Sequence, residues 1–510
     1  MKYTRILFLF TLLCAALASL QAVHANIITV ANTADSGPGS LRQALADAND
    51  VDTIDFDSSL RGQTITLTSG QLLVRNSLTI SGPGAANLAV NGNAASRVFL
   101  LLSGQTVTIS GLTITNGQAS PSSGGGIYND HSTLTVSSCT ISGNSAFDGG
   151  GIYNNGFSNG SATLTVSNCT ISGNSASYGG GGIFNDGNYG SATLEVLSST
   201  LSSNSAPDGG DIFNNGTYGS ATVGVTNSTL SSNSVPEGGG IYNIGYSGSA
   251  TLEILNSTLN GNWPYYSGGG IENYFATTQL GSNIFNASDI INYSGTITSL
   301  GYNLSSDAAG GDGTTGPGGL LNATGDIRNM DPMLGPLQDN GGPTFTHELL
   351  SRSPAIDAGD PNFDPPPDND QRGPGFSRVV NGRIDIGAFE AQTVTPSYAG
   401  QIQAPINADG TSIFSVRRGV VPVKFTLTQG GIATCDLPPA TIAVTRTGGG
   451  VIGGVNESLY SGNADAGSNF RIDNCQYLYN LNSRALGVGI YRVEILINGQ
   501  PVGSAVFQLQ

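Results

Sequence analysis

The hexapeptide Gly-Gly-Gly-Ile-Tyr-Asn at Gly124–Asn129 opens a repeat, because it returns unchanged at Gly149–Asn154. Four variants of it follow further along the chain. They occupy Gly180–Asn185, Gly209–Asn214, Gly238–Asn243 and Gly268–Asn273. Successive copies are 25 to 31 residues apart. A period of this size is typical of a solenoid, in which each repeat forms one unit and successive units stack on one another.

Each repeat contains three short runs rich in Val, Ile, Leu and Thr, for example Leu164–Val166, Cys169–Ile171 and Gly181–Phe184. The runs alternate with a period of two and are too short for helices. Asn, Gly and Ser separate them, and these residues tolerate the left-handed backbone angles of tight corners. The sequence therefore predicts an all-β chain built on a parallel β-helix with about 30 residues per coil.

Equivalent residues of successive coils are expected to stack at about 4.8 Å, the spacing between neighbouring strands. Two apolar columns and the motif isoleucines are predicted to form the core, with Cys139 and Cys169 as small inward fillers. The motif asparagines predict a ladder of side-chain amides along one corner. The apolar columns are Leu134, Leu164, Leu194, Val223 and Leu252, and Ile141, Ile171, Leu201, Leu230 and Leu259; the asparagines are Asn129, Asn154, Asn185, Asn214, Asn243 and Asn273.

The net charge limits which partners the protein can bind, and the N-terminal sequence indicates where the protein is located. The formal net charge is −17, which argues against nucleic acid and against anionic membrane surfaces as partners. At 1–25, Lys2 and Arg5 precede an apolar run that ends in Val-His-Ala, the pattern of a signal peptide. No later stretch is apolar enough to span a bilayer. We expect a secreted or cell-surface protein of a bacterium.

Residues 26–97 are predicted to form an N-terminal cap and the first coils. Ser40 is a suitable N-cap for a short amphipathic helix that begins at Leu41. The segment Ile28–Asn49 resembles the module that opens many exported bacterial β-helix proteins, in which a Ser-Leu-Arg-Glu-Ala motif follows Asp-Ser-Gly. This chain has Gln43 in place of the Glu and Gly39 in place of a Cys. The resemblance implies an exported protein with a right-handed coil.

Residues 98–304 hold the repeats, and residues 305–392 are predicted to close the β-helix. Within Met330–Glu390, four motifs together resemble the choice-of-anchor Q domain, a module of surface proteins. The resemblance implies display on the cell surface. The motifs are Asp339-Asn340-Gly341-Gly342-Pro343-Thr344, Ser353-Pro354-Ala355-Ile356-Asp357-Ala358-Gly359-Asp360, Asp370-Gln371-Arg372-Gly373 and Arg383-Ile384-Asp385-Ile386-Gly387-Ala388-Phe389-Glu390.

A linker at 393–400 and a separate domain at 401–510 complete the chain. Short runs of alternating apolar and polar residues, such as Val423–Thr428, predict an immunoglobulin-like β-sandwich. The surroundings of Pro422-Val423-Lys424-Phe425 resemble the small PxKF domain of exported bacterial proteins. Cys435 and Cys475 are the only cysteines of this domain, and in an oxidising compartment they are expected to form a disulfide.

Catalysis is disfavoured by the residues of the coils. A polysaccharide lyase needs an Arg or Lys base, yet there is neither between Arg97 and Arg328. Hydrolysis needs two carboxylates, and Glu195 and Glu253 are predicted to face outward two coils apart, at roughly 10 Å. A second outward column holds Asp148, Asp208 and Glu237. Outward acids more often confer solubility. A cleft containing Arg75, Arg97 or Arg328 would be needed for lyase chemistry.

One aromatic residue per repeat follows the motif isoleucine and is predicted to point outward. Two interpretations remain open: the rings stack on one another, which we favour, or they carry a glycan chain. These glycan-binding candidates are Tyr128, Tyr153, Phe184, Phe213 and Tyr242.

Calcium is the only metal that the sequence suggests. An oxygen-rich, Pro-containing loop in the closing segment offers carboxylates for Ca²⁺. They belong to Asp357, Asp360, Asp364, Asp368 and Asp370. Their spacing matches no established calcium motif, and no other cofactor is expected.

The sequence thus favours a secreted or cell-surface stalk that acts without catalysis as an adhesin, a structural element or a glycan-binding protein. Its expected partner is an extracellular glycan or a surface protein. The repeats also resemble those of chlamydial polymorphic outer-membrane proteins, which are adhesins. The alternative function is a polysaccharide lyase or glycoside hydrolase acting on an extracellular polysaccharide.

Overall fold

The computed structural model describes residues 25–235, 239–264, 269–392, 398–429, 432–435, 437–449, 453–454, 465, 467–497 and 500–510. The predicted signal peptide therefore lies, except for its last residue, outside the described residues. The chain forms two compact units, Met1–Gln392 and Thr393–Gln510, which are described separately below. Within the described residues, no helix has the length and apolar character needed to cross a membrane.

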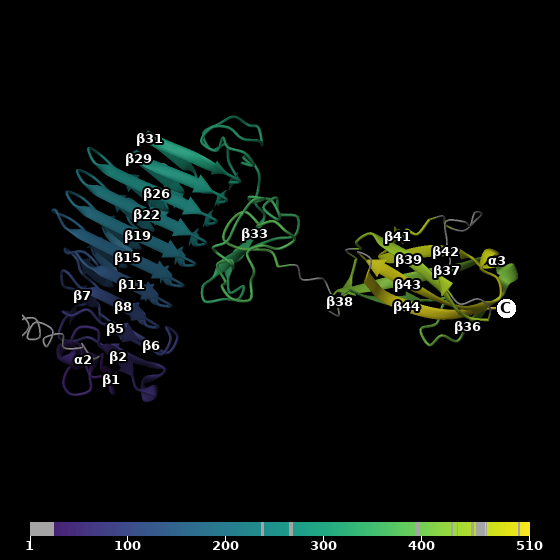
Figure 1. Cartoon of the computed structure of the whole chain (residues 1–510), viewed down its shortest axis with the longest axis horizontal. Coiled ribbons are helices and arrows are strands. Elements are labelled where there is room, and N and C mark those ends of the chain that lie inside the picture. The colour runs from purple at the N-terminus through teal and green to yellow at the C-terminus, as the bar shows by residue number, and fades with distance from the viewer. Residues whose placement is uncertain are drawn as a thin grey trace, which may run out of the picture. The chain divides into compact units, whose positions relative to one another are not determined.

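The first unit is a parallel β-helix of about 9 turns with about 29 residues per turn, which confirms the predicted fold class. Its strands stack in a regular column in Figure 1. Three columns of strands run along it. The first comprises β4 (Leu72–Val74), β7 (Phe99–Leu101), β10 (Ile127–Asp130), β14 (Ile152–Asn155), β18 (Ile183–Asp186), β21 (Ile212–Asn215), β25 (Ile241–Ile244) and the starts of β29 (Ile271–Gly281) and β31 (Ile290–Gly301).

The second column continues each coil after a corner. It comprises β1 (Ile27–Val30), β2 (Thr53–Phe56), β5 (Thr79–Ser81), β8 (Thr106–Ser110), β11 (Thr133–Ser137), β15 (Ser161–Ser167), β19 (Ser191–Leu197), β22 (Ser220–Thr226), β26 (Ser249–Leu255) and the ends of β29 and β31.

The third column forms a separate sheet. It comprises β3 (Gln63–Thr66), β6 (Leu88–Asn91), β9 (Thr113–Thr115), β12 (Thr140–Ser142), β16 (Thr170–Ser172), β20 (Thr200–Ser202), β23 (Thr229–Ser231), β27 (Thr258–Asn260), β30 (Ile284–Asn286) and β32 (Leu304–Ser305). Two short pairs flank the coils, β13 (Ser145–Asp148) with β17 (Ser175–Gly179) and β24 (Ser234–Val235) with β28 (Trp263–Pro264).

The predicted columns are in register. Ile152 pairs with Ile183, and Leu164 pairs with Leu194. Both predicted apolar columns and the motif isoleucines are fully buried, because alternate residues of each strand point inward. The thiols Cys139 and Cys169 are buried and free. The backbone N–H of Cys139 lies 3.3 Å from the Cys169 sulfur, and the backbone N–H of Cys169 donates to the Ser199 hydroxyl. The two cysteines therefore act as small inward fillers, as predicted.

The motif asparagines form the predicted amide ladder. Each buried Nδ2 donates to the Oδ1 of the next asparagine, from Asn129 to Asn154 and onward to Asn273, at 2.7 to 3.0 Å. A second amide ladder, from Asn144 through Asn174 to Asn204, lines the corner after the third strand column. Both ladders pair polar groups that are buried inside the coil and would otherwise lack water.

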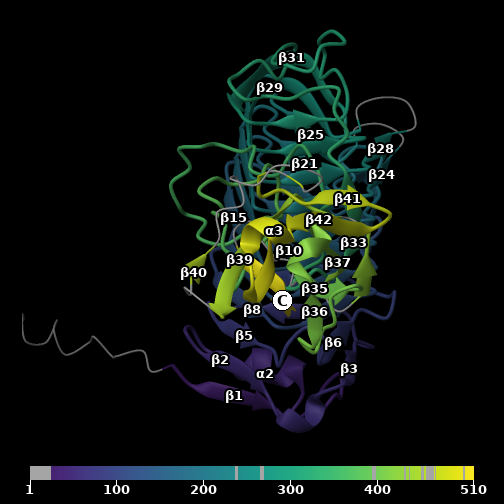
Figure 2. The same ribbon diagram turned by 90° about the vertical axis from the view of Figure 1, so that its right-hand side faces the viewer.

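The cap at the N-terminal end is the predicted helix, α2 (Leu41–Asp47), drawn beside β1 and β2 in Figure 2. The side chain of Ser40 accepts a hydrogen bond from the Gln43 backbone N–H. Leu41, Ala44 and Leu45 are buried and belong to the core of the β-helix. A 3₁₀ turn, η1 (Ser58–Leu60), follows β2.

The segment after β32 folds back along the outside of the β-helix and carries an antiparallel pair, β33 (Leu334–Gln338) and β34 (Thr346–Leu349). We call residues 305–392 the closing module. It packs on the third strand column, where the buried Gln371 bonds to Thr200 and Thr229. His347 contacts Ser231 at 2.9 Å. The module therefore covers one side of the coils in addition to their end.

The second unit is a two-sheet β-sandwich, as predicted. One sheet contains β35 (Tyr398–Gln403), β37 (Val420–Gln429), β38 (Ile432–Thr434), β41 (Arg471–Asp473) and β42 (Gln476–Asn482). The other contains β36 (Ser412–Phe414), β39 (Ala440–Gly448), β40 (Gly453–Gly454), β43 (Gly489–Ile497) and β44 (Gln500–Leu509). The short helices η2 (Val416–Arg418) and α3 (Ser483–Leu486) connect strands.

The core of the sandwich is shared between the two sheets and includes Phe425, Tyr477 and Phe507. Cys435 and Cys475 form the expected disulfide. The sandwich begins slightly earlier than expected, because β35 starts at Tyr398, inside the predicted linker.

Candidate functional site

The aromatic column singled out in the sequence forms a ladder of packed rings, buried at its centre and partly buried at Tyr128 and Tyr242, which we call the inner aromatic ladder. Its members Tyr128, Tyr153, Phe184, Phe213 and Tyr242 lie 4.5 to 5.2 Å apart between ring centroids. Phe184 and Phe213 are only 3% exposed, and Tyr153 is 8% exposed.

The flat faces of the inner aromatic ladder are therefore occupied by neighbouring rings. Tyr178 also packs against Phe213, at 6.0 Å between centroids. The hydroxyl of Tyr153 donates to Asp186 at 2.5 Å. Of the two interpretations left open above, self-stacking describes these rings. They form a satellite core, against which Tyr128 and Tyr242 pack as partly buried members.

A second aromatic column lies at the corner between the first and second strand columns, and the sequence analysis missed it. We call it the outer aromatic ladder; it is formed by Phe157, Tyr189, Tyr218, Tyr246 and Phe275. Successive ring centroids are 4.9 to 6.3 Å apart. Each side chain is 42% to 52% exposed. The β-helix thus presents one solvated ring per coil over five consecutive coils.

The corner that carries the outer aromatic ladder is tight. Tyr189 and Tyr218 have φ of 52° and 53°, a left-handed conformation that costs a non-glycine residue about 1 to 2 kcal/mol. A Cβ on the following Gly190 would lie 1.9 Å from the Gly156 carbonyl oxygen, so only glycine fits there. The backbone N–H of Tyr218 donates to the Tyr246 carbonyl at 3.1 Å. Backbone bonds between coils therefore hold the rings in place.

Three of the four neighbouring pairs of rings in this ladder meet edge to face. Tyr189 and Tyr218 are stacked with planes 15° apart, whereas Tyr218 and Tyr246 meet edge to face at 89°. Within the described part of the chain, the hydroxyls of the three tyrosines make no hydrogen bond. Tyrosine combines a flat apolar ring with a polar tip, and here both are accessible to solvent.

The sequence contains a pattern that indicates the outer aromatic ladder, but the spacing between the motif asparagine and the ring varies from coil to coil. The first four rings follow the motif asparagine by three or four residues and stand next to glycine or serine, as in Asn-Tyr-Gly at 188–190 and Thr-Tyr-Gly at 217–219, whereas Phe275 follows Asn273 by two residues. In the coil that contains Phe275 the corner is shorter and the strand β29 runs through it. Position in the corner, rather than spacing from the motif, aligns the five rings.

The predicted outward carboxylates are in the expected columns. Glu195 and Glu253 both align with Gly224 on the strand between them, so they lie two coils apart, about 10 Å. The Glu195 carboxylate fills the space above Gly224, 2.3 Å from where a Cβ would be. Burial, and then the charge of Glu253, raises the pKa of Glu195.

The structure also shows two of the three predicted members of the second acidic column. Asp148 and Asp208 both align with Gly179, and Glu237 lies outside the described residues. Burial raises the pKa of Asp148 to about 6.

Two of the three arginines considered as a lyase base are engaged in structural contacts. Arg97 lies over the Tyr128 ring at 4.9 Å and donates to Ser122 at 2.7 Å. Arg328 is buried and donates to the backbone carbonyls of Gly316 and Ala308. Neither guanidinium faces an open site.

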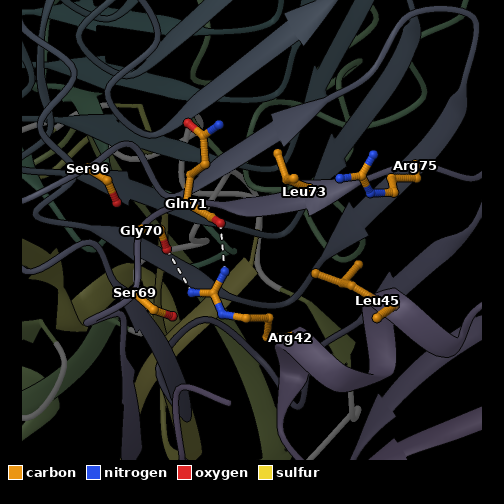
Figure 3. A pocket seen from close by; sticks show the side chains of 9 residues that line it. Arg42, Leu45, Ser69, Gly70, Gln71, Leu73, Arg75 and Ser96 are labelled. Atoms are coloured by element: carbon orange, nitrogen blue, oxygen red, sulfur yellow. Dashed lines mark hydrogen bonds between the residues drawn. The ribbon is translucent and has the colours of Figure 1, made fainter. Parts of the chain in front are cut away.

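The third arginine, Arg75, lines a cavity of about 560 Å³ beside the cap helix (Figure 3). Arg42, on the opposite wall, donates to the carbonyls of Gly70 and Gln71 at 2.7 Å each and to Asp35 at 2.6 Å. Leu45 and Leu73 supply apolar lining, and the described lining residues include no acid.

The five aspartates considered for calcium do not come together as a cluster. Asp370 is buried in an ion pair with Arg372 at 2.5 Å. Asp360 accepts a hydrogen bond from the Asn362 backbone, while Asp364 and Asp368 are exposed. Asp357 donates its backbone N–H to Asp385. Among the described residues, no three His, Cys, Asp or Glu side chains gather to hold a metal ion, so calcium binding stays a prediction.

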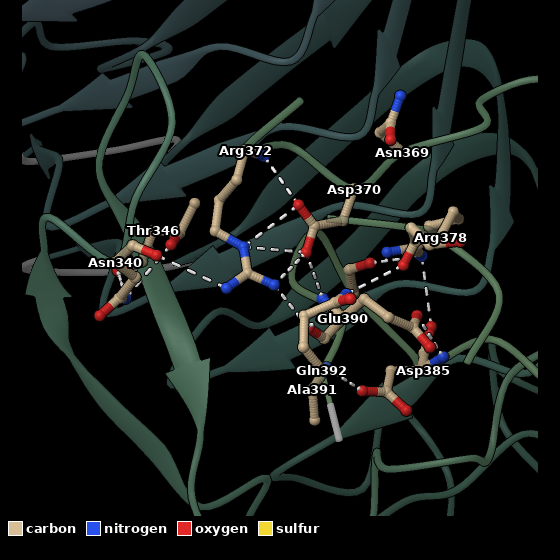
Figure 4. A network of polar contacts seen from close by, with 12 residues as sticks. Asn340, Thr346, Asn369, Asp370, Arg372, Arg378, Asp385, Glu390, Ala391 and Gln392 are labelled. Carbon is tan, nitrogen blue, oxygen red and sulfur yellow. Dashed lines mark hydrogen bonds and ion pairs between the residues drawn. The ribbon is translucent and has the colours of Figure 1, made fainter. Parts of the chain in front are cut away.

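Asp370 belongs instead to a buried polar network in the closing module, shown in Figure 4. The Arg372 guanidinium lies between the rings of Phe376 and Phe389, at 3.9 and 3.7 Å from their centroids. Arg378, Asp385 and Glu390 lie nearby and are also buried. Hydrogen bonds and ion pairs of this network connect the turns of the closing module. This indicates that the network has a structural role.

Comparison with known proteins supports no assignment beyond the fold. No protein-family model and no curated protein matches the chain, so the resemblances to the choice-of-anchor Q and PxKF domains stay predictions. The crystal structure of pectate lyase Pel9A is similar over 72% of this chain and 97% of that one, with 15% identity and a TM-score of 0.44.

A mutant of the PL6 family alginate lyase AlyGC is similar over 76% of this chain, with 11% identity and a TM-score of 0.28. The chain spans 61% of the length of that lyase. At these identities and TM-scores, neither likeness bears on activity.

Proposed function

We propose that this protein is a secreted or cell-surface β-helix stalk that binds an extracellular glycan without cleaving it. The outer aromatic ladder carries the proposal. Sugar rings present flat C–H faces and equatorial hydroxyls, which suit solvated aromatic rings with polar tips. A stalk that holds such a ligand is suited to adhesion or to building a cell envelope.

The regularity of the outer aromatic ladder favours a polymer over a small molecule. One ring is repeated at each coil, at centroid distances of 4.9 to 6.3 Å. Four of the five rings are flanked by glycine, serine, threonine or asparagine instead of other apolar side chains, whereas Phe275 stands between Tyr274 and Ala276. This differs from the continuous apolar centre of a protein interface. A linear ligand that lies along the helix axis would contact each coil in turn.

Affinity electrophoresis through gels that contain single polysaccharides tests the proposal. The purified chain is expected to be retarded by at least one polymer, and the double variant Y189A/Y218A is expected to lose the retardation. Tyr178→Ala is the matched control, because Tyr178 is as exposed as Tyr218, at 48%, but lies outside the ladder. Retardation that persists in the double variant would refute the ladder as the binding surface.

A glycoside hydrolase is the second candidate, and the Glu195 and Glu253 pair favours it. Two carboxyls roughly 6.5 to 9.5 Å apart, one with a raised pKa, are the requirement for inverting hydrolysis. Reducing ends should be measured on the same polymers that retard the chain. Release that Glu195→Gln and Glu253→Gln each abolish would establish hydrolysis and overturn the non-catalytic proposal.

A further inference from the structure

The electrostatic surroundings of the outer aromatic ladder restrict the kind of glycan that fits it. All five rings lie between Arg97 and Arg328, an interval without a single Lys or Arg. Proteins recognise carboxylates, sulfates and phosphates chiefly through guanidinium and ammonium groups. The coils that carry the ladder contain none, so an anionic polymer would find no countercharge from them.

Acids stand close to the ladder instead. Asp186 ends β18, three residues before Tyr189, and accepts hydrogen bonds from the Asn188 backbone and the Asn215 side chain. Asp130 holds the equivalent position on β10, where its carboxylate bonds to His131 and Asn155. Two like charges 4 Å apart repel by about 1 kcal/mol in water and about 4 kcal/mol near a protein surface. A polyuronate would meet such repulsion near these two positions, while the column continues with the uncharged Asn155, Asn215 and Ile244.

The polar groups beside the rings are uncharged. Asn188 and Thr217 immediately precede Tyr189 and Tyr218, and Ser158 and Ser247 follow Phe157 and Tyr246. The backbone N–H groups of Asn188 and Thr217 are bonded within the corner, and both side chains are partly exposed. Amides and hydroxyls of this kind pair with sugar hydroxyls without a charge on either side.

From the ladder and its surroundings we infer that the ligand is a linear, uncharged polysaccharide that lies along the β-helix axis on the outer aromatic ladder. The inference rests on the proposed function and specifies its ligand class. A neutral chain needs stacking surfaces and hydroxyl partners, both of which are present. It does not need cations, which the coils lack. Single-stranded nucleic acid also stacks on aromatic rings but requires a basic groove, and so does not fit.

A panel of polymers of similar length tests the inference with the full chain. Neutral glucan, xylan and mannan are compared with polygalacturonate and alginate, each at low and high salt. We expect binding to at least one neutral polymer, insensitive to salt, lost in Y189A/Y218A and kept in Tyr178→Ala. Equal or tighter binding of a polyuronate through the same two tyrosines would overturn the inference while leaving the proposed function intact.

The remaining outcomes bear on the proposed function. If the chain binds no polymer, both the proposed function and the inference are overturned. The same holds if copies of the chain associate with one another and thereby cover the exposed tyrosines. A gain-of-charge variant separates the cases further. N188K/T217K places two ammonium groups beside the rings and is expected to acquire polyuronate binding that high salt removes. Failure of this variant to bind polyuronate would argue against electrostatic exclusion as the reason for the preference.

Discussion

Asn154 illustrates how a single side chain stabilises two coils at once. It is fully buried. It accepts a hydrogen bond from Asn129 at 2.7 Å and donates to Asn185 at 2.7 Å and to the Thr193 carbonyl at 3.0 Å. Because no water reaches these groups, each lost partner leaves an unsatisfied polar atom inside the coil.

Asn154→Ala is expected to destabilise the β-helix by about 2 to 4 kcal/mol, because it removes several buried hydrogen bonds at once. Urea denaturation followed by circular dichroism measures the change. Asn188→Ala, at a partly exposed asparagine of the neighbouring corner, is the control and should alter stability by less than about 0.5 kcal/mol. If the two substitutions lower the free energy of unfolding equally, the amide ladder stabilises the protein no more than a surface asparagine does.

Glu390 makes the stability of the closing module depend on pH. Burial, and then the negative charge of Asp385, raises the pKa of Glu390 from 4.5 to about 8. The folded protein therefore holds this proton more tightly than the unfolded chain does. Its contribution to stability is complete below pH 4.5, declines as the pH rises toward 8 and is lost above that.

Glu390→Gln cannot titrate and should lack this decline. Relative to the wild type, its melting temperature is expected to rise by several degrees between about pH 5 and about pH 9. Glu348→Gln, at a partly exposed glutamate of β34, serves as the control. A melting-temperature difference between Glu390→Gln and the wild type that stays constant with pH would show that Glu390 is not the titrating group.

Asp211 is a single residue whose environment the repeat pattern does not predict. It replaces the third glycine of the motif and is fully buried. Its carboxylate accepts hydrogen bonds from Asn204 and Asn233 and so interrupts the second amide ladder. Burial raises the pKa of Asp211 well above its ordinary value. The repeat pattern predicts a glycine at this position, and only the coordinates show how the carboxylate is accommodated.

Two aromatic ladders run along the same β-helix and are expected to respond differently to substitution. The inner one is buried and stacked, and the outer one is solvated. A residue of the inner ladder should thus contribute to stability. A residue of the outer ladder should contribute to binding.

Phe184→Ala is expected to cost about 3 to 5 kcal/mol of stability, the usual range for a truncated buried ring. Tyr218→Ala should cost about 1 kcal/mol or less, partly because it keeps the same left-handed backbone. Thermal and urea unfolding of both variants provide the measurement. A larger loss in Tyr218→Ala than in Phe184→Ala would reverse the roles assigned to the two ladders.

The closing module depends on a small number of buried polar contacts with the coils. Gln371 is fully buried, accepts from Thr229 at 2.6 Å and donates to Thr200 and Thr344 at 2.8 and 3.0 Å. Gln371→Ala would remove the bond of the Thr229 hydroxyl and one bond each from Thr200 and Thr344, whose hydroxyls still donate to the Phe345 and Ser198 carbonyls.

Limited proteolysis should therefore cleave Gln371→Ala within residues 305–392 faster than the wild type, with a loss of about 1 to 3 kcal/mol in the free energy that holds the module closed. Hydrogen exchange should show lower protection in β20 and β23, on which the module packs. Gln338→Ala, an exposed glutamine of β33, is the control. Unchanged cleavage in Gln371→Ala would mean that apolar contacts alone hold the module.

At the scale of the whole molecule, repetition made the architecture predictable. Residues such as Leu164 and Leu194 recur at the coil period, and the register of β15 with β19 follows directly. The cap helix and the disulfide were predictable because Ser40 is a local capping signal and Cys435 has one partner in its domain. The described residues thus reproduce the predicted fold class, with its cap helix, coils and sandwich.

The candidate site was less predictable, because strand alternation separates inward from outward residues but does not reveal burial. Phe184 points outward, as predicted, yet its neighbours cover it. Tyr189 lies in a corner whose length changes between coils, where period-two reasoning does not apply. The packing of the closing module on the third strand column involves contacts across more than a hundred residues, which no local pattern encodes.

The most direct measurement is isothermal titration of the purified chain with neutral oligosaccharides of increasing length, taken from whichever polysaccharide retards it. Five rings one coil apart span about 20 Å along the axis. The affinity should rise with each added sugar until the oligosaccharide covers this span and should then level off, and Y189A/Y218A should abolish the rise. An affinity that is independent of length, or unchanged in Y189A/Y218A, would contradict binding along the outer aromatic ladder.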